Sequence, residues 1–192
     1  MDSDNQQRIQ TTLYRADAPV SRHWVTPSPS SSGMKQESLN PNGVEDSQSR
    51  EILTQLRNKQ LLIVNSRRRN GLILYKPYYT EFAGPGASVG GMFDLDCQRV
   101  LPVGNLSLVH PESTDDRQRA FLIRRQWIRL TKQITDNPVP LQRAQMILNQ
   151  FEGFFDAQTV AQIPDEAFAL LVGVLPQTIQ KVRHTADRLD IC

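Results

Sequence analysis

Residues 165–184 constrain the fold more than any other stretch of this sequence. Ala169 is small enough to let two helices cross closely, and Gly173, four residues later, can adopt the positive φ that ends a helix. Pro176 suits the first turn of a following helix, where its missing N–H group costs nothing. The stretch therefore predicts two helices joined by a tight turn at a glycine.

The spacing of Ala169, Gly173, Ile179 and Val182 resembles the helix-turn-helix module of DNA-binding proteins. The resemblance is confined to residues 165–184. It implies that the helix beginning at Pro176 enters the major groove of DNA. The same pattern also fits a packing corner between two helices of an all-α domain, so this second interpretation stays open.

Three leucines depart from the usual helix-turn-helix pattern. Leu170 and Leu171 are apolar where polar residues are common, and Leu175 stands where a Ser or Thr cap is expected. We expect Leu170 and Leu171 to form a homodimer surface, which would suit a two-fold symmetric operator, or to bind another protein partner.

The resemblance also implies which side chains of the second helix contact DNA. Gln177, Thr178 and Lys181 point outward, and a glutamine can form two hydrogen bonds with the edge of an adenine. The side chains that lie further along the helix would contact phosphates: Arg183, His184 and Arg188.

A second basic feature is predicted near the middle of the chain. The apolar runs 61–64 and 72–75 are typical of strands, and the Asn70-Gly71 pair between them is typical of a β-hairpin turn. A helix followed by a hairpin with a basic tip resembles the wing of winged-helix proteins. The tip would contact phosphates or be an ordinary solvated turn, and it carries Arg67, Arg68 and Arg69.

A long amphipathic helix is predicted over residues 115–135. Ser113 or Thr114 can cap it, and Ile123, Trp127, Leu130 and Ile134 follow the spacing i, i+4, i+7, i+11 of one buried face. A basic helix face is usually an ordinary solvated face, but no acidic residue occurs between positions 117 and 132, so binding of an anionic partner is the second interpretation. The basic residues expected on the other faces are Arg117, Arg119, Arg124, Arg125, Arg129 and Lys132, of which Arg124, Arg125 and Arg129 are the predicted phosphate contacts.

These patterns predict an α+β fold that is mostly α-helical. Residues 1–48 are rich in Pro, Ser and Asn and are expected to form a disordered arm. Residues 49–111 are expected to form a small α+β region with the hairpin, and 112–192 a helical domain that ends in the helix-turn-helix-like unit.

The sequence offers little support for catalysis, a metal or a cofactor. The glycine-dense segment 84–91 lacks the Lys-Ser/Thr ending of a phosphate loop and is expected to be a flexible connection. Asp94 and Asp96 lack a third carboxylate or histidine nearby in sequence, so a metal site there is weakly supported. We therefore expect no enzyme activity, no cofactor and no metal.

Composition is compatible with one ordinary core in a soluble, cytoplasmic protein. The chain has 192 residues, 39% of them hydrophobic, a formal net charge of +2, and only two cysteines, at 97 and 192. The favoured function is DNA binding, as a transcription-associated regulator. The alternative is a non-catalytic scaffold or adaptor that uses the same apolar and basic surfaces to bind a protein.

Overall fold

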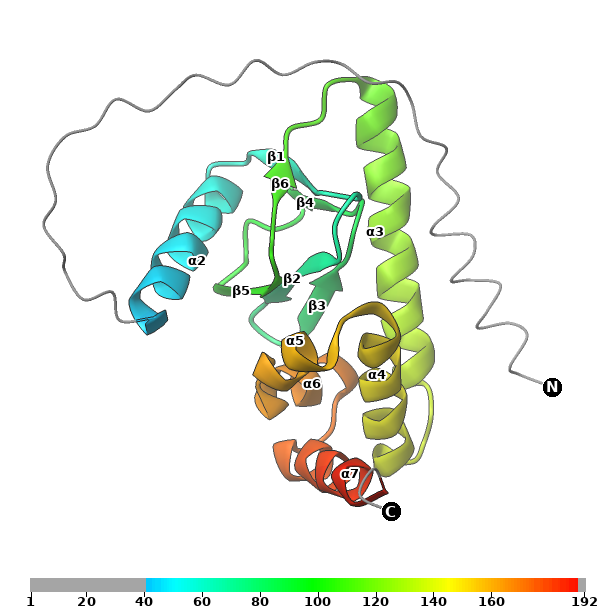
Figure 1. The fold of residues 1–192 in the computed structure, drawn as a ribbon. Coiled ribbons are helices and arrows are strands. Elements are labelled where there is room, and N and C mark those ends of the chain that lie inside the picture. The colour runs from blue at the N-terminus through cyan, green and yellow to red at the C-terminus, as the bar shows by residue number, and fades with distance from the viewer. Residues whose placement is uncertain (1–40, 190–192) are drawn as a thin grey trace, which may run out of the picture. The chain divides into compact units, whose positions relative to one another are not determined.

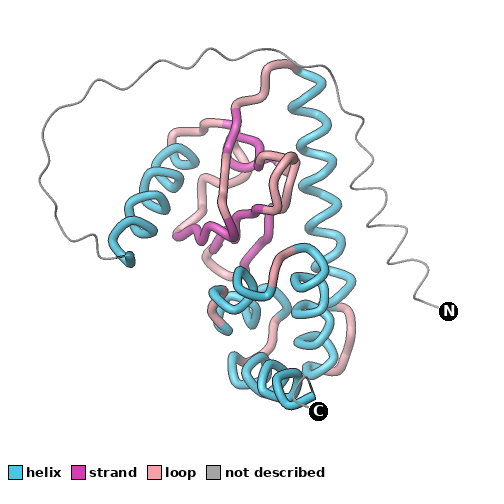
Figure 2. Tube along the Cα trace, viewed as in Figure 1, coloured by secondary structure: helices cyan, strands magenta, loops and turns pink. Residues whose placement is uncertain are grey.

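The computed structural model describes residues 41–189, in which one helix is followed by six strands in two small sheets and then by five helices (Figures 1 and 2). The expected α+β class with a helical majority is confirmed. Residues 1–40 of the predicted arm lie outside this range, and from Pro41 onward the chain is already helical. The elements are α2 (Pro41–Arg57), β1 (Leu61–Val64), β2 (Asn70–Tyr75), β3 (Thr80–Ala83), β4 (Ser88–Gly90), β5 (Arg99–Gly104), β6 (Leu108–Val109), α3 (Thr114–Thr135), α4 (Pro140–Phe154), α5 (Ala157–Gln162), α6 (Asp165–Val172) and α7 (Pro176–Leu189).

The two antiparallel sheets have the strand orders β4-β1-β6 and β3-β2-β5. β2 is the central strand of the second sheet, and all six of its residues are buried. This agrees with the continuous apolar run that the sequence shows at this position. α2 packs on β5 and β4, and α3 packs on β3 and β4. The strands lie before the predicted boundary between residues 111 and 112 and α3 lies after it, so the two predicted regions pack against each other.

The hairpin predicted between residues 61 and 75 is wrong. β1 pairs with β4 and β6, whereas β2 pairs with β3 and β5, so the two strands belong to different sheets. Asn70 and Gly71 lie inside β2, paired with Gly104 and Val103. Gly71 is required by packing, because a Cβ atom there would lie 2.4 Å from the ring of Phe82. Residues 67–69 form an exposed connection between the sheets.

The glycine-dense segment is also different from the expectation. Residues 84–91 are largely buried and include β4, so they are not a flexible connection. Gly84 packs against the indole of Trp127, and a Cβ atom at this position would lie only 2.3 Å from that ring, which explains why the chain needs a glycine there. Residues 92–95 form turns and bends, and of residues 106–109 only Leu108–Val109 is a strand.

An aromatic cluster joins the second sheet to the C-terminal helices. The Phe82 ring on β3 lies 5.2 Å from that of Trp127 on α3 and 4.8 Å from that of Phe151 on α4, measured between centroids. Phe151 in turn meets Phe168 of α6 edge to face at 4.9 Å. These contacts fix α6, and through it α7, on the rest of the core.

The cap expected from Ser113 at the start of the long helix is confirmed. The Ser113 hydroxyl accepts from the Asp116 N–H, and the Asp116 side chain accepts from the Ser113 N–H, which forms a capping box at the start of α3. Asp156 caps α5 through the Thr159 N–H at 2.9 Å. Within residues 41–189, no helix is long and apolar enough to cross a membrane.

Candidate nucleic-acid interface

α6 and α7 form the expected helix–turn–helix. Gly173 ends α6 with φ 62° and ψ 49°, and its N–H donates to the Ala169 carbonyl. The next residue, Val174, donates to the same carbonyl at 3.0 Å. Ala169 is buried where the helices approach, so the small residue and the left-handed glycine have the roles that their spacing predicted.

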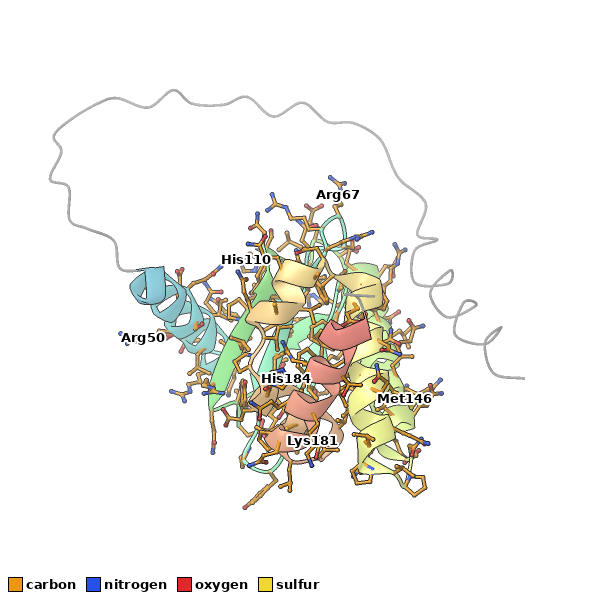
Figure 3. All side chains as sticks on the ribbon, turned by 60° about the horizontal axis from the view of Figure 1, so that its bottom comes forward. Arg50, Arg67, His110, Met146, Lys181 and His184 are labelled. Carbon is orange, nitrogen blue, oxygen red and sulfur yellow. The ribbon has the colours of Figure 1, made fainter. Side chains whose placement is uncertain are left out.

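One face of α7 holds the helix on the protein, and the opposite face is open. Ile179 and Val182 are buried against α4 and α6. Gln177, Lys181 and His184, spaced i, i+4 and i+7, are exposed along the outer face. Figure 3 labels Lys181 and His184 on this helix. Thr178 is half-buried, and its N–H donates to the Leu175 carbonyl in the first turn, so it lies beside this outer row and not within it.

Arg183 differs from the expected phosphate contact. Its Nε atom lies 2.9 Å from the Asp165 carboxylate, and Nη2 donates to the carbonyl oxygens of Ile163 and Val160 at 2.7 and 3.3 Å. The half-buried guanidinium therefore braces α7 against α5 and α6. The side chain of Arg188 lies outside the described residues.

Arg124 also differs: the expectation that it lies on the exposed basic face is wrong. Its side chain is 7% exposed, and Nη1 donates to the Ser88 carbonyl of β4 at 3.0 Å. Nη2 pairs with Glu81 of β3 and lies 3.4 Å from Asp94. Arg124 thus ties α3 to both sheets. Arg125 and Arg129 are exposed, as expected.

The two aspartates weighed as a metal pair bind a buried lysine instead. Lys76 Nζ lies 3.0 Å from Asp94 and 2.5 Å from Asp96, and it also donates to the Phe93 carbonyl at 2.7 Å. The second Asp94 oxygen accepts from the Gly90 N–H at 2.7 Å. Among the described residues, no group of three or more His, Cys, Asp or Glu side chains is arranged to hold a metal ion.

The Lys76 contacts shift two pKa values in opposite directions. Burial alone would lower the pKa of Lys76, but hydrogen bonds with Asp96 and Asp94 outweigh it and raise the pKa above its ordinary 10.5. The hydrogen bond from Lys76 lowers the pKa of Asp96 below its ordinary 3.8. Lys76 therefore stabilises the fold fully below pH 10.5, and this contribution is lost as pH rises through the folded-state pKa.

Asp96→Asn is expected to destabilise the protein at neutral pH, and the difference from the parent chain should shrink as pH falls. Asp96 contributes stability above pH 3.8, which is lost as pH falls through its lower folded-state pKa. Urea denaturation at neutral and acidic pH measures the free energy of unfolding of both chains. Glu152→Gln, at an exposed position of α4, is the control. A difference that is constant with pH would contradict the prediction.

The two leucines expected to share a dimer surface are separated by the helix. Leu170 is 45% exposed, but Leu171 is buried in the core, because one residue along a helix turns the side chain by about 100°. The proposed Leu170–Leu171 surface is therefore wrong for Leu171. Leu175, in the turn between α6 and α7, is also apolar and 69% exposed.

The connection with Arg67, Arg68 and Arg69 is exposed, but it does not adjoin α7. Figure 3 shows Arg67 at one end of the molecule, with His184 and Lys181 toward the other. The resemblance to a wing is not sustained either, because the flanking strands do not form a hairpin. These arginines and α7 are two separate surfaces.

A group of exposed apolar residues was missed by the sequence interpretation. It includes Phe121, Leu122 and Ile128 of α3 and Phe93 of the connection between β4 and β5. The sequence contained a signal for them: the three helix residues lie outside the buried row that Ile123 begins.

Comparison with known proteins adds no functional assignment, since no family model, curated protein or solved structure matches this chain.

Proposed function

We propose that this protein binds DNA through α7, as a transcription-associated regulator in the cytoplasm. The observation that carries the proposal is the two-sided geometry of α7. Ile179 and Val182 anchor one face, while Gln177, Lys181 and His184 stand free on the other. A recognition helix needs this combination, because base contacts require a rigid helix with an accessible polar face.

The outer row divides into two kinds of contact. Gln177 lies in the first turn of α7, where recognition helices meet base edges, and its amide can bind an adenine through two hydrogen bonds. Lys181, one turn further, supplies a charge to a phosphate, and His184 extends the same row. Thr178 would contact the DNA backbone from the edge of this row.

The electrostatics around α7 support an anionic ligand. The acidic residues at the start of α6 are Asp165 and Glu166. Asp165 is paired with Arg183, and Glu166 lies 3.8 Å from Arg99. These two carboxylates of α6 are therefore partly neutralised, and Lys181 is exposed to solvent. Arg183 has a positioning role here, since it holds α7 and does not itself face outward.

Titration of the full chain with a fluorescent duplex DNA at several salt concentrations tests the proposal. Non-specific binding should have a Kd of about 10⁻⁴–10⁻⁶ M and weaken steeply with salt. Lys181→Ala should weaken binding to all sequences and reduce the salt slope by about one. Once a preferred site is selected, Gln177→Ala should cost about 1–3 kcal/mol in discrimination at one base pair.

Arg57→Ala is the matched control for Lys181→Ala, because it removes one exposed positive charge from the end of α2. We expect its Kd and salt slope to stay close to those of the parent chain. Salt-sensitive binding that Arg57→Ala and Lys181→Ala weaken equally would reject α7 as the site. Absence of binding at low salt would reject the function.

A further inference from the structure

The outward face of α3 exposes large apolar side chains beside basic ones. Leu122 and Ile128 are 55% and 40% exposed, and Phe121 is also exposed. The Phe121 ring stacks on that of Phe93, with centroids 5.2 Å apart and planes inclined by 30°. Phe93 is itself 64% exposed, so the stacked pair forms a rigid apolar surface that is open to solvent.

Four residues form a continuous row on this face, which we call the α3 seam: Phe121, Arg125, Ile128 and Lys132. They follow the spacing i, i+4, i+7, i+11, so they lie on one side of the helix, away from the buried Trp127 and Ile134. The seam spans about 17 Å at 1.5 Å per residue, enough for about three turns of a partner helix. Apolar and basic residues alternate along it.

The charge on this face is uncompensated within the helix. No Asp or Glu occurs from Arg117 to Thr135, and the one arginine with acidic partners, Arg124, is turned inward. Arg125 and Lys132 of the seam, with Arg129 beside it, remain exposed. Interface cores are enriched in aromatic residues and arginine, and this face combines both.

We propose that the α3 seam binds an acidic amphipathic helix of another protein. Apolar side chains of that helix would cover Phe121 and Ile128, and its Glu or Asp residues would pair with Arg125 and Lys132. This binding surface is separate from α7 and extends the proposed function, because it gives a DNA-binding protein a place to recruit a protein partner.

Other occupants fit the seam less well. A DNA backbone would meet the basic side chains but would leave Phe121, Leu122 and Ile128 without an apolar partner. A second copy of α3 would bring basic rows together. The chain's own residues 1–40 carry acidic and basic residues in balance, so they lack the complementary charge.

Two synthetic peptides of about 18 residues test the proposal, each with leucines on one helical face. One carries Glu beside the leucines, and the other carries Lys at the same positions. Fluorescence anisotropy with the full chain should show binding of the Glu peptide that weakens with salt, and at least tenfold weaker binding of the Lys peptide. Ile128→Glu should weaken binding of the Glu peptide at least tenfold.

Gln126→Glu is the matched control, since it adds the same charge at an exposed position turned by about 160° from Ile128 on the helix. It should change the Kd less than threefold. Arg125→Glu is a second test if Ile128→Glu fails to fold, because Arg125 is exposed. It should also weaken binding of the Glu peptide at least tenfold.

Three results would overturn the proposal. The first is that the two peptides bind equally well, or that neither peptide binds. The second is a peptide Kd that Ile128→Glu and Arg125→Glu leave unchanged. The third is self-association of the full chain in sedimentation that Ile128→Glu abolishes, which would make the seam an interface between copies of this chain.

Discussion

Arg124→Ala is expected to lower the free energy of unfolding by about 3–5 kcal/mol, the usual cost of removing one partner from a buried ion pair. Arg124 joins three parts of the fold: Glu81 on β3, the Ser88 carbonyl on β4 and Asp94 in the following loop. Alanine would leave the carboxylate of Glu81, whose side chain is 19% exposed, without its charged partner and would remove one of the contacts that hold α3 on both sheets. Urea denaturation followed by circular dichroism measures the change.

Arg125→Ala is the matched control, because it removes the same side chain one residue later, where it is exposed. Its effect should stay within about 0.5 kcal/mol, as for most surface substitutions. Comparable destabilisation by the two variants would show that the network around Arg124 contributes little.

The position of Arg124 illustrates why the sequence located α3 but misjudged one of its faces. The spacing of Ile123, Trp127, Leu130 and Ile134 correctly predicted the buried side of the helix. Periodicity assigns a charged residue to the surface by default. The partners that draw Arg124 inward lie 30 to 43 residues earlier in the chain, so no local pattern contains them.

The same distinction between local and long-range determinants explains why the hairpin between residues 61 and 75 was wrongly predicted. The Asn70-Gly71 pair is a strong hairpin signal, but β2 is completed by β5, whose pairing partner for Asn70 is Gly104. The helix-turn-helix was predictable because Ala169 and Gly173 act within a few residues of each other. The outer face of α7 followed from the same periodicity, whereas the engagement of Arg183 by α5 and α6 did not.

Gly90→Ala is expected to lower the free energy of unfolding by about 2–5 kcal/mol through two separate costs. Gly90 has φ +84°, a conformation that costs an L-residue about 1–2 kcal/mol. A Cβ atom there would lie 2.0 Å from the Gln60 carbonyl oxygen, so the backbone must move, and overpacking of this kind costs about 1–3 kcal/mol. That carbonyl accepts from the Gly91 N–H at 2.9 Å, and this hydrogen bond would be displaced.

Gly173→Ala separates the two costs. Gly173 has a similar φ of +62°, but no heavy atom lies within 4 Å of its would-be Cβ atom. Its substitution should therefore carry the backbone cost alone, about 1–2 kcal/mol. Urea denaturation of both variants should show that Gly90→Ala loses more stability. Equal losses would mean that the backbone at Gln60, where β1 begins to pair with β4, can move away from the added Cβ atom without a cost in free energy. Gly90 would then be needed only for its positive φ.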